Sequence, residues 1–279
     1  MTRQDDDAVV PAGPRTGALH LAASWLTVLP VRQPRSAPDR RDGARVIAAV
    51  PVLGLGFGIV VAALLAGLAR TDLPTPVSGT LAVVFLASIT RGMHLDGLAD
   101  TADGLGCYGD PERVRTVMRS GDVGPFGAAT LVLVLLLQAL SFAALAGDHR
   151  WYALAFAVFL GRVAVVLACR TGLSAGNPDG FGALVAGTQR ASIVLWLLVA
   201  TALAAAAGRL DVPGSGPATF SSSFTVLPVV RALIATALVV AFALLFTRHC
   251  ARRTGGISGD VLGATLELST VLALLVLLL

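Results

Sequence analysis

The sequence contains no lysine, and charged residues make up only 14% of its 279 residues. Soluble proteins average about 25% charged residues. Hydrophobic residues account for 55% of the chain, and the mean hydropathy is +0.79. This balance is typical of a membrane protein and argues against a soluble domain. We therefore expect the lipid bilayer to be the main surroundings of the chain.

Because lysine is absent, all 21 basic residues are arginines, and the formal net charge is +4. The arginines are scattered along the chain, whereas a protein that follows a nucleic-acid backbone gathers them into one stripe. We therefore expect no nucleic-acid partner. Cysteine is also scarce, since there are three and none forms a CxxC pair, which favours small apolar residues over a metal or redox motif.

Long apolar stretches are the main positive signal. A helix needs about 20 residues to cross the hydrocarbon core, and seven stretches approach or exceed this length, the second being the shortest. We predict an all-α, polytopic integral membrane protein with about seven transmembrane helices. The stretches are 46–69, 77–91, 124–146, 151–169, 191–208, 228–247 and 261–279.

The N-terminal region does not follow this pattern. Residues 17–31 are apolar apart from three polar positions and end near Pro30. At about 15 residues this stretch is short for a span, so we predict an interfacial or re-entrant helix. Residues 1–16 lack the basic start and apolar stretch of a signal peptide. We expect a disordered tail there, followed by a single membrane domain over 17–279.

Arginines are concentrated in alternate loops, and this bias predicts the orientation of the array. By the positive-inside rule, the arginine-rich loops face the cytoplasm, and the C-terminal Leu279 lies outside. The loop at 209–227 is then an external linker. The cytoplasmic arginines are Arg32, Arg35, Arg40, Arg41, Arg45, Arg113, Arg115, Arg119, Arg170, Arg190, Arg248, Arg252 and Arg253, whereas the intervening loops hold only Arg70, Arg150 and Arg209.

The hydrophilic loop at 92–123 is the most acidic part of the chain, with six of its 17 acidic residues. Asp96, Asp100 and Asp103 are spaced so that a helix would place them on one face. Like charges on one face are tolerated when a divalent cation neutralises them, and carboxylates suit Mg²⁺ or Mn²⁺. Glycines in the same segment would let the backbone approach a ligand closely. The alternative is a solvated acidic loop without a ligand.

Two further features flank these aspartates. His94 could be a general base or could hold a carboxylate by a hydrogen bond, and the sequence leaves both open. Downstream, Asp110 and Pro111 predict the N-cap and first residue of a short amphipathic helix. Its arginines suit bidentate phosphate contacts, or else they only set the topology at the membrane surface. They are Arg113, Arg115 and Arg119.

A second acidic pair, Asp260 and Glu267, lies at the start of the last apolar stretch. Glu267 is about two turns inside an apolar helix, where an ionisable group is costly and marks a functional candidate paired with a metal or an arginine. The alternative is a structural ion pair with Arg162, which lies in the fourth apolar stretch.

Four motifs, in this order along the chain, resemble those of a known family. They are WLTVLPV at 25–31, RGMHLDGLADTADG at 91–104, MRSGDVGPFG at 118–127 and GGISGDVLGATLELS at 255–269. On these motifs the chain resembles the adenosylcobinamide-GDP ribazoletransferase family, also called the cobalamin synthase family. It departs from the family at Thr270, where relatives often have a second glutamate, and near Asn177, where relatives tend to have an arginine.

The resemblance implies a membrane enzyme that transfers the adenosylcobinamide-phosphate group from adenosylcobinamide-GDP to α-ribazole or its 5′-phosphate. The products would be adenosylcobalamin or its 5′-phosphate, and GMP. The implied cofactor is Mg²⁺, and the implied location is the bacterial plasma (inner) membrane with the active loop at the cytoplasmic side. The sequence leaves a homo-oligomer open.

This resemblance also suggests roles for the candidate residues. Asp96, Asp100 and Asp103 would hold the metal and form the catalytic set with His94, which would activate the attacking hydroxyl. Asp260 and Glu267 would complete the metal site or bind a second ion. The substrate-binding residues would be Arg113, Arg115, Arg119 and Asp260.

Two other classes of protein compete with this interpretation. A CDP-alcohol phosphotransferase has a similar aspartate motif, but it places an Ala-Arg pair after its Asp-Gly, whereas here Ala99 is followed by Asp100. A carrier would use its acidic residues as a substrate path. Carriers usually place such residues in matching positions of two halves, and no matching halves are apparent in this sequence.

Overall fold

The computed structural model describes residues 17–32, 37–211 and 224–279. The predicted disordered tail at 1–16 and most of the predicted linker at 209–227 lie outside these residues. The described part contains eleven helices and no named strand, so the prediction of an all-α protein is confirmed.

Six helices are long and apolar enough to cross a membrane, and a bent pair of helices provides a seventh crossing if it is counted as one span. The prediction of about seven transmembrane helices is therefore confirmed. The bent pair is α3 (Thr75–Ile89) and α4 (Met93–Gly106), which meet at 92°. The six single helices are α2 (Arg40–Leu68), α6 (Pro125–Gly147), α7 (Trp151–Ala168), α9 (Ala191–Leu210), α10 (Val226–Thr254) and α11 (Gly259–Leu278).

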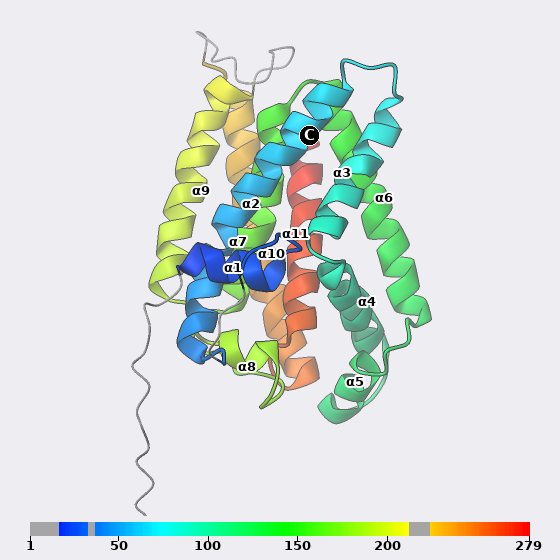
Figure 1. Cartoon of the computed structure of the whole chain (residues 1–279), viewed down its shortest axis with the longest axis vertical. Coiled ribbons are helices and arrows are strands. Elements are labelled where there is room, and N and C mark those ends of the chain that lie inside the picture. The colour runs from blue at the N-terminus through cyan, green and yellow to red at the C-terminus, as the bar shows by residue number, and fades with distance from the viewer. Residues whose placement is uncertain (1–16, 33–36, 212–223) are drawn as a thin grey trace, which may run out of the picture.

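The bundle is built around α7 and α11, which are largely enclosed by the other helices (Figure 1). Small residues let the helix backbones approach closely, as is common in membranes. A Cβ atom at Gly58 would lie 2.5 Å from the carbonyl oxygen of Ala155, and one at Gly161 would lie 2.1 Å from Thr270 Oγ1. Glycine at these positions therefore lets α2 pack closely against α7, and α7 against α11.

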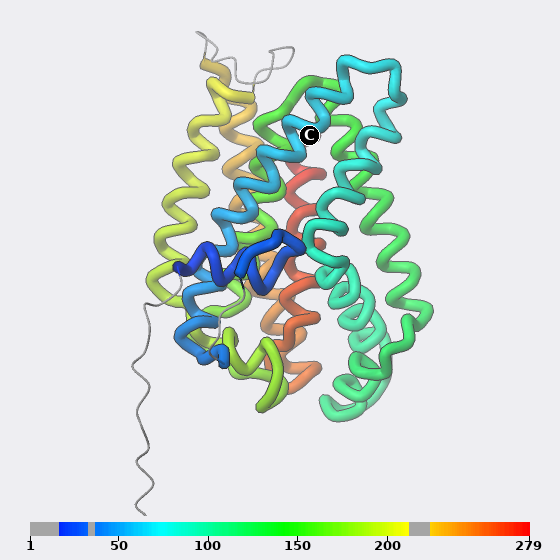
Figure 2. The backbone as a smooth tube through the Cα atoms, in the orientation of Figure 1, coloured from blue at the N-terminus to red at the C-terminus, as the bar shows by residue number. Residues whose placement is uncertain are grey.

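Successive spanning segments run in opposite directions through the bundle, as Figure 2 shows. The loops that the sequence groups as arginine-rich lie at one end of the bundle, at the bottom in Figure 1, and the C-terminus lies at the other end. The short helix α1 (Ala18–Leu26) lies across α2 and has nine residues, too few to span. It agrees with the prediction of a non-spanning N-terminal helix.

The hydrophilic segment 92–123, which the sequence predicts as a loop with a short amphipathic helix from Pro111, forms two helices, α4 and α5 (Pro111–Met118). The apolar and small side of α4 is buried, including Leu98 and Ala99. The predicted start of α5 is confirmed, since the Asp110 side chain accepts a hydrogen bond from the amide of Arg113 at 2.9 Å.

The bend between α3 and α4 depends on two successive residues in the left-handed region. Arg91 has φ of 57° and Gly92 has φ of 69°. Glycine adopts this conformation readily, whereas a long side chain such as that of Arg91 rarely does. The bend directs α4 along the start of α11, and so positions the acidic motif.

Candidate active site

Close packing of α4 against α11 brings the two acidic motifs together. A Cβ atom at Gly97 on α4 would lie 2.7 Å from the Cα of Asp260, and one at Gly263 on α11 would lie 3.0 Å from the carbonyl oxygen of His94. These two glycines therefore permit direct backbone contact between segments that are distant in the sequence. The predicted meeting of Asp260 with the aspartates of α4 follows from this contact.

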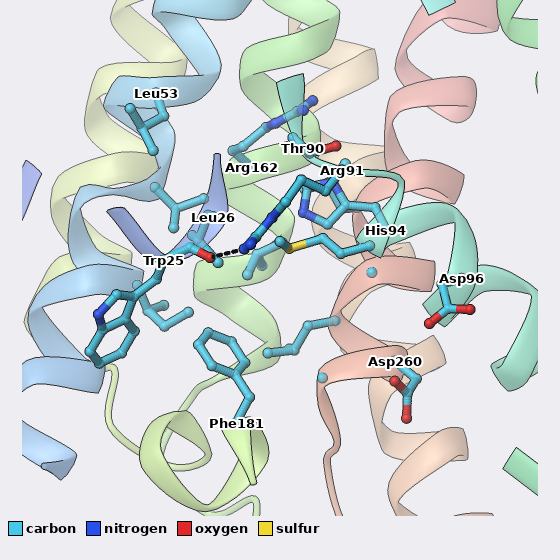
Figure 3. Close-up of a pocket in the computed structure, with 18 of the residues that line it drawn as sticks. Trp25, Leu26, Leu53, Thr90, Arg91, His94, Asp96, Arg162, Phe181 and Asp260 are labelled. Carbon is cyan, nitrogen blue, oxygen red and sulfur yellow. Dashed lines mark hydrogen bonds between the residues drawn. The ribbon is translucent and has the colours of Figure 1, made fainter. Parts of the chain in front are cut away.

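Several carboxylates lie around Asp100 at this contact. The negative charges of Asp96, Asp260 and Asp103 all act on the carboxylate of Asp100, which is partly buried. Asp96 is exposed, and Asp260 is partly buried with its carboxylate 3.2 Å from the Ser258 hydroxyl. Figure 3 shows Asp96 and Asp260 near one another at the rim of a cavity. Their mutual repulsion creates a demand for a cation.

Asp103 has a different environment, although it lies on the same helix. Its side chain is 8% exposed. Its two carboxylate oxygens accept hydrogen bonds from the amides of Gly124 at 2.7 Å and Gly127 at 2.9 Å. These amides belong to the N-terminus of α6, where a negative charge is stabilised by the unpaired N–H groups and the helix dipole. Asp103 therefore anchors α4 to α6.

Glu267 lies deep in the bundle and contacts two polar side chains. The Gln138 amide on α6 donates a hydrogen bond to Glu267 Oε2 at 2.6 Å, and His94 Nδ1 is 3.8 Å from Glu267 Oε1. A buried carboxylate requires such partners, because removal from water penalises its charge. Among the described residues no ion pair joins Glu267 to Arg162, although the positive charge of Arg162 acts on Glu267 from a greater distance.

His94 lies next to the buried Glu267 and also lines a cavity. Its Nδ1 atom is buried without a hydrogen-bond partner and faces Glu267 at the distance given above. Both interpretations from the sequence remain compatible with this position, since the ring approaches a carboxylate and also reaches the cavity.

The three predicted phosphate-binding arginines are not equivalent. The Arg119 guanidinium donates a hydrogen bond to the Asn177 side chain, and its charge acts on Asp260. Arg115 and Arg119 both line a small cavity of about 150 Å³ beside Asp260. The Arg115 guanidinium, however, donates a hydrogen bond to the Thr254 carbonyl oxygen at 2.8 Å. Arg113 is exposed at the surface. The structure therefore brings Arg119, and not Arg113, to the carboxylates.

A larger cavity of about 660 Å³ adjoins the carboxylates. It lies between α1, α2, α7, α8 (Phe181–Val185) and the start of α11, and Figure 3 shows its labelled lining residues. Arg91 and Arg162 line it together with His94. The motif at 91–104 includes Arg91, but the sequence does not indicate that Arg91 lines the site. Its side chain reaches toward α1 only because of the bend between α3 and α4.

Comparison with known proteins adds a separate observation. Residues 18–278 match the family model described as cobalamin-5-phosphate synthase. The chain belongs to this family. Proteins named adenosylcobinamide-GDP ribazoletransferase are similar over nearly the whole length. The relative from Frankia casuarinae is 38% identical over 91% of this chain and 92% of its own, and the one from Corynebacterium efficiens is 37% identical over 91% and 88%.

A more distant member, from Geotalea daltonii, is 33% identical over 92% of this chain and 95% of its own, and has the same name. No solved structure matches the chain. The cobalamin-5-phosphate synthase family is neither of the two competing classes weighed from the sequence. All four motifs that carry the resemblance lie within the matched residues.

The acidic residues of this site are candidates for holding a metal ion. Among the described residues, no three His, Cys, Asp or Glu side chains converge on one point at metal-ligand distances. Mg²⁺, however, is usually held by one or two carboxylates together with substrate phosphates and water, without an all-protein cage. One or two of the carboxylates of Asp96, Asp100 and Asp260 would supply that kind of donor set. Those of Asp103 and Glu267 are already engaged with other groups.

Proposed function

We propose that the protein transfers the adenosylcobinamide-phosphate group from adenosylcobinamide-GDP to α-ribazole or its 5′-phosphate and releases GMP. The observation that carries this proposal is the α4–α11 contact, which brings Asp96 and Asp260 to the cavity that His94 lines, with their charges acting on Asp100. Membership of the cobalamin-5-phosphate synthase family and the names of the relatives support the same reaction.

Mg²⁺ is the proposed cofactor, held by Asp96, Asp100 and Asp260. When bound, it would neutralise charge on the pyrophosphate of the donor, which is the main requirement of phosphoryl transfer. Arg119 lies beside Asp260 and is held by Asn177, so its guanidinium is placed to contact phosphate oxygens as well. Asn177 therefore helps to position an arginine, although its own loop lacks the arginine that relatives tend to have there.

His94 is the proposed general base. With the proton on Nδ1 oriented toward Glu267, Nε2 can accept the proton of the ribose hydroxyl that attacks phosphorus. The new bond joins this hydroxyl oxygen to the phosphorus attached to cobinamide, and the bond to the GMP oxygen breaks. The distance of 3.8 Å between His94 and Glu267 is long for a hydrogen bond, and such contacts commonly tighten when substrate binds.

The proposed location is the bacterial plasma membrane, with the arginine-rich end of the bundle in the cytoplasm. The distribution of arginines supports this orientation, and α4, α5 and the start of α11 lie in the half of the bundle that ends in those loops (Figure 1). Both substrates would then approach from the cytoplasm.

The reaction is tested with purified protein in liposomes that receives adenosylcobinamide-GDP, α-ribazole and Mg²⁺. The proposal predicts GMP and adenosylcobalamin in equal amounts. A parallel sample with CDP-diacylglycerol and an alcohol acceptor should release no CMP. Release of CMP without any GMP in the first sample would favour the CDP-alcohol class and overturn the proposal.

A further inference from the structure

The cavity of about 660 Å³ has two chemically different sides. His94, Asp96 and Asp260 form the polar side, next to the proposed reaction centre. The opposite side consists mainly of apolar side chains from α1, α2, α7 and α8, including Ile47, Val50, Leu53, Val165 and Leu184. A ligand that fills this cavity therefore has a polar end that reaches His94 and an apolar end directed away from it.

Two aromatic residues mark the apolar side. Trp25 on α1 and Phe181 on α8 pack edge to face, with ring centroids 6.3 Å apart and planes at 76°. Both line the cavity, as Figure 3 shows. Aromatic side chains bind flat rings through stacked or edge-to-face contacts. The apolar end of the ligand is therefore expected to be a flat aromatic ring.

Arg91 connects the aromatic wall to the reaction centre. Its guanidinium reaches from the α3–α4 bend across the cavity and donates a hydrogen bond to the Trp25 carbonyl oxygen at 3.2 Å (Figure 3). Its φ of 57° is costly for a non-glycine residue. Such strain persists where the surrounding structure requires it, often beside a ligand. Arg91 therefore links the α3–α4 bend to α1 beside the cavity.

We propose that this cavity binds the aromatic base of the acceptor riboside, with its ribose hydroxyl directed toward His94. This inference rests on the proposed function and deepens it by separating the two substrates. A benzimidazole ring is flat and mainly apolar, and so it matches the wall formed by Leu53, Trp25 and Phe181. The volume lies within the range of about 300–1,000 Å³ that is usual for small-molecule sites.

The donor also carries an aromatic base, guanine, but the lining favours the acceptor. Guanine has hydrogen-bond donors and acceptors around its edge. Arg91 can pair with the acceptors only, and each group left unpaired against the apolar side chains would cost about 1–3 kcal/mol. The corrin ring with its amide side chains is far larger than a benzimidazole riboside. The donor is therefore placed outside the cavity, with only its pyrophosphate at the carboxylates.

Steady-state kinetics of two independent variants test this assignment. Leu53→Trp fills the apolar side, and Phe181→Ala removes one aromatic ring. We expect each to raise the KM for α-ribazole about tenfold, with less than a twofold change in the KM for adenosylcobinamide-GDP. The control is Leu198→Ala on α9, where the side chain is 66% exposed, and both KM values should remain at the wild-type level.

Binding of α-ribazole alone provides a second readout that requires no turnover. The acceptor should quench the fluorescence of Trp25, measured in a variant in which the other tryptophans, Trp151 and Trp196, are replaced by phenylalanine. Further replacement of Trp25 by phenylalanine should abolish the signal. Guanosine should produce no quenching.

Three results would overturn the inference while leaving the proposed function intact, provided that the wild type forms adenosylcobalamin. One is a rise in the donor KM alone, which assigns the cavity to guanine. Another is unchanged KM values in both folded variants, which indicates that a lipid chain or nothing occupies the cavity. The third is quenching by guanosine and not by α-ribazole. Failure of the wild type to release GMP from both substrates would instead overturn the proposed function.

Discussion

At the scale of single residues, the chemistry of the site depends on which oxygen atoms are left free by the fold. The charges of Asp96 and Asp260 act on Asp100, and this repulsion would be relieved by the proposed cation. Asp103 is committed to the amides of α6, and Glu267 is committed to Gln138 and His94. We therefore propose three separate roles for these acidic residues, namely metal binding, helix anchoring and positioning of a base.

Asp103→Asn tests the anchoring role. The amide nitrogen of asparagine would face a backbone N–H in place of an oxygen, so we expect a loss of about 1–3 kcal/mol in the free energy of unfolding. Thermal unfolding in detergent micelles measures the loss. Binding of Mn²⁺, followed by its electron paramagnetic resonance signal, should stay within about twofold of wild type. A loss of Mn²⁺ affinity as large as that of Asp100→Asn would make Asp103 a ligand.

Glu267→Gln tests the positioning role. The variant keeps the size of the side chain but removes the charge that orients His94, so we expect kcat to fall about 100-fold or more. The Mg²⁺ concentration for half-maximal activity and both KM values should remain near those of wild type. The double variant with His94→Ala should lose little more than His94→Ala alone, because the two residues act as a unit. Losses that multiply, or a large rise in the Mg²⁺ requirement, would contradict this role.

The sequence singles out these acidic residues as a group, but it does not distinguish their surroundings. Helical spacing places Asp96, Asp100 and Asp103 on one broad face, and this face contacts α11 and α6 at different points. The partners that distinguish them, such as Gly124 and Gln138, belong to other helices. Spacing within one segment carries no information about such distant partners.

At the scale of secondary-structure elements, the decisive feature is the approach of α4 to α11. Hydropathy predicts the spanning helices well, because burial in lipid acts on each segment by itself. It does not predict that 92–106 is helical, since that depends on packing against α6 and α11. Nor does it predict the 92° bend, which requires Arg91 in a conformation that arginine rarely adopts.

Gly97→Ala tests the role of this helix contact. The added Cβ would lie 2.7 Å from the Cα of Asp260, so α4 must move away from α11. We expect about 1–3 kcal/mol of destabilisation and about a 100-fold loss of activity from misplaced groups. Thermal unfolding and GMP release measure the two effects.

The matched control is Gly56→Ala on α2, because a Cβ atom there would meet open space. It should be stable and active, since alanine also favours the helix. Full activity of Gly97→Ala would show that the α4–α11 distance is not critical and would contradict the site as described.

At the scale of the whole molecule, the fold places all arginine-rich loops at one end and the acidic site in the adjoining half of the bundle (Figure 1). α7 and α11 form the enclosed centre, so the groups that they carry, including Glu267, are shielded from lipid. The bundle can therefore enclose polar groups although its helices are mainly apolar.

The orientation is tested by labelling introduced cysteines in intact cells. In a Cys107→Ser background, we expect a membrane-impermeant maleimide to label Asp72→Cys directly. It should label Ser120→Cys only after the membrane is made permeable, because both positions are exposed but lie at opposite ends of the bundle. The reverse pattern would place the acidic site outside the cell.

The proposed role of the α4 aspartates in Mg²⁺-dependent transfer is tested by GMP release from Asp100→Asn as a function of Mg²⁺ concentration, compared with wild type. The control is Asp148→Asn, an exposed aspartate at the opposite end of the bundle. We expect wild type and Asp148→Asn to depend equally on Mg²⁺, and Asp100→Asn to remain at least about 100-fold slower at saturating Mg²⁺. Near-normal GMP release by Asp100→Asn, or release by wild type after complete chelation of divalent ions, would contradict this role.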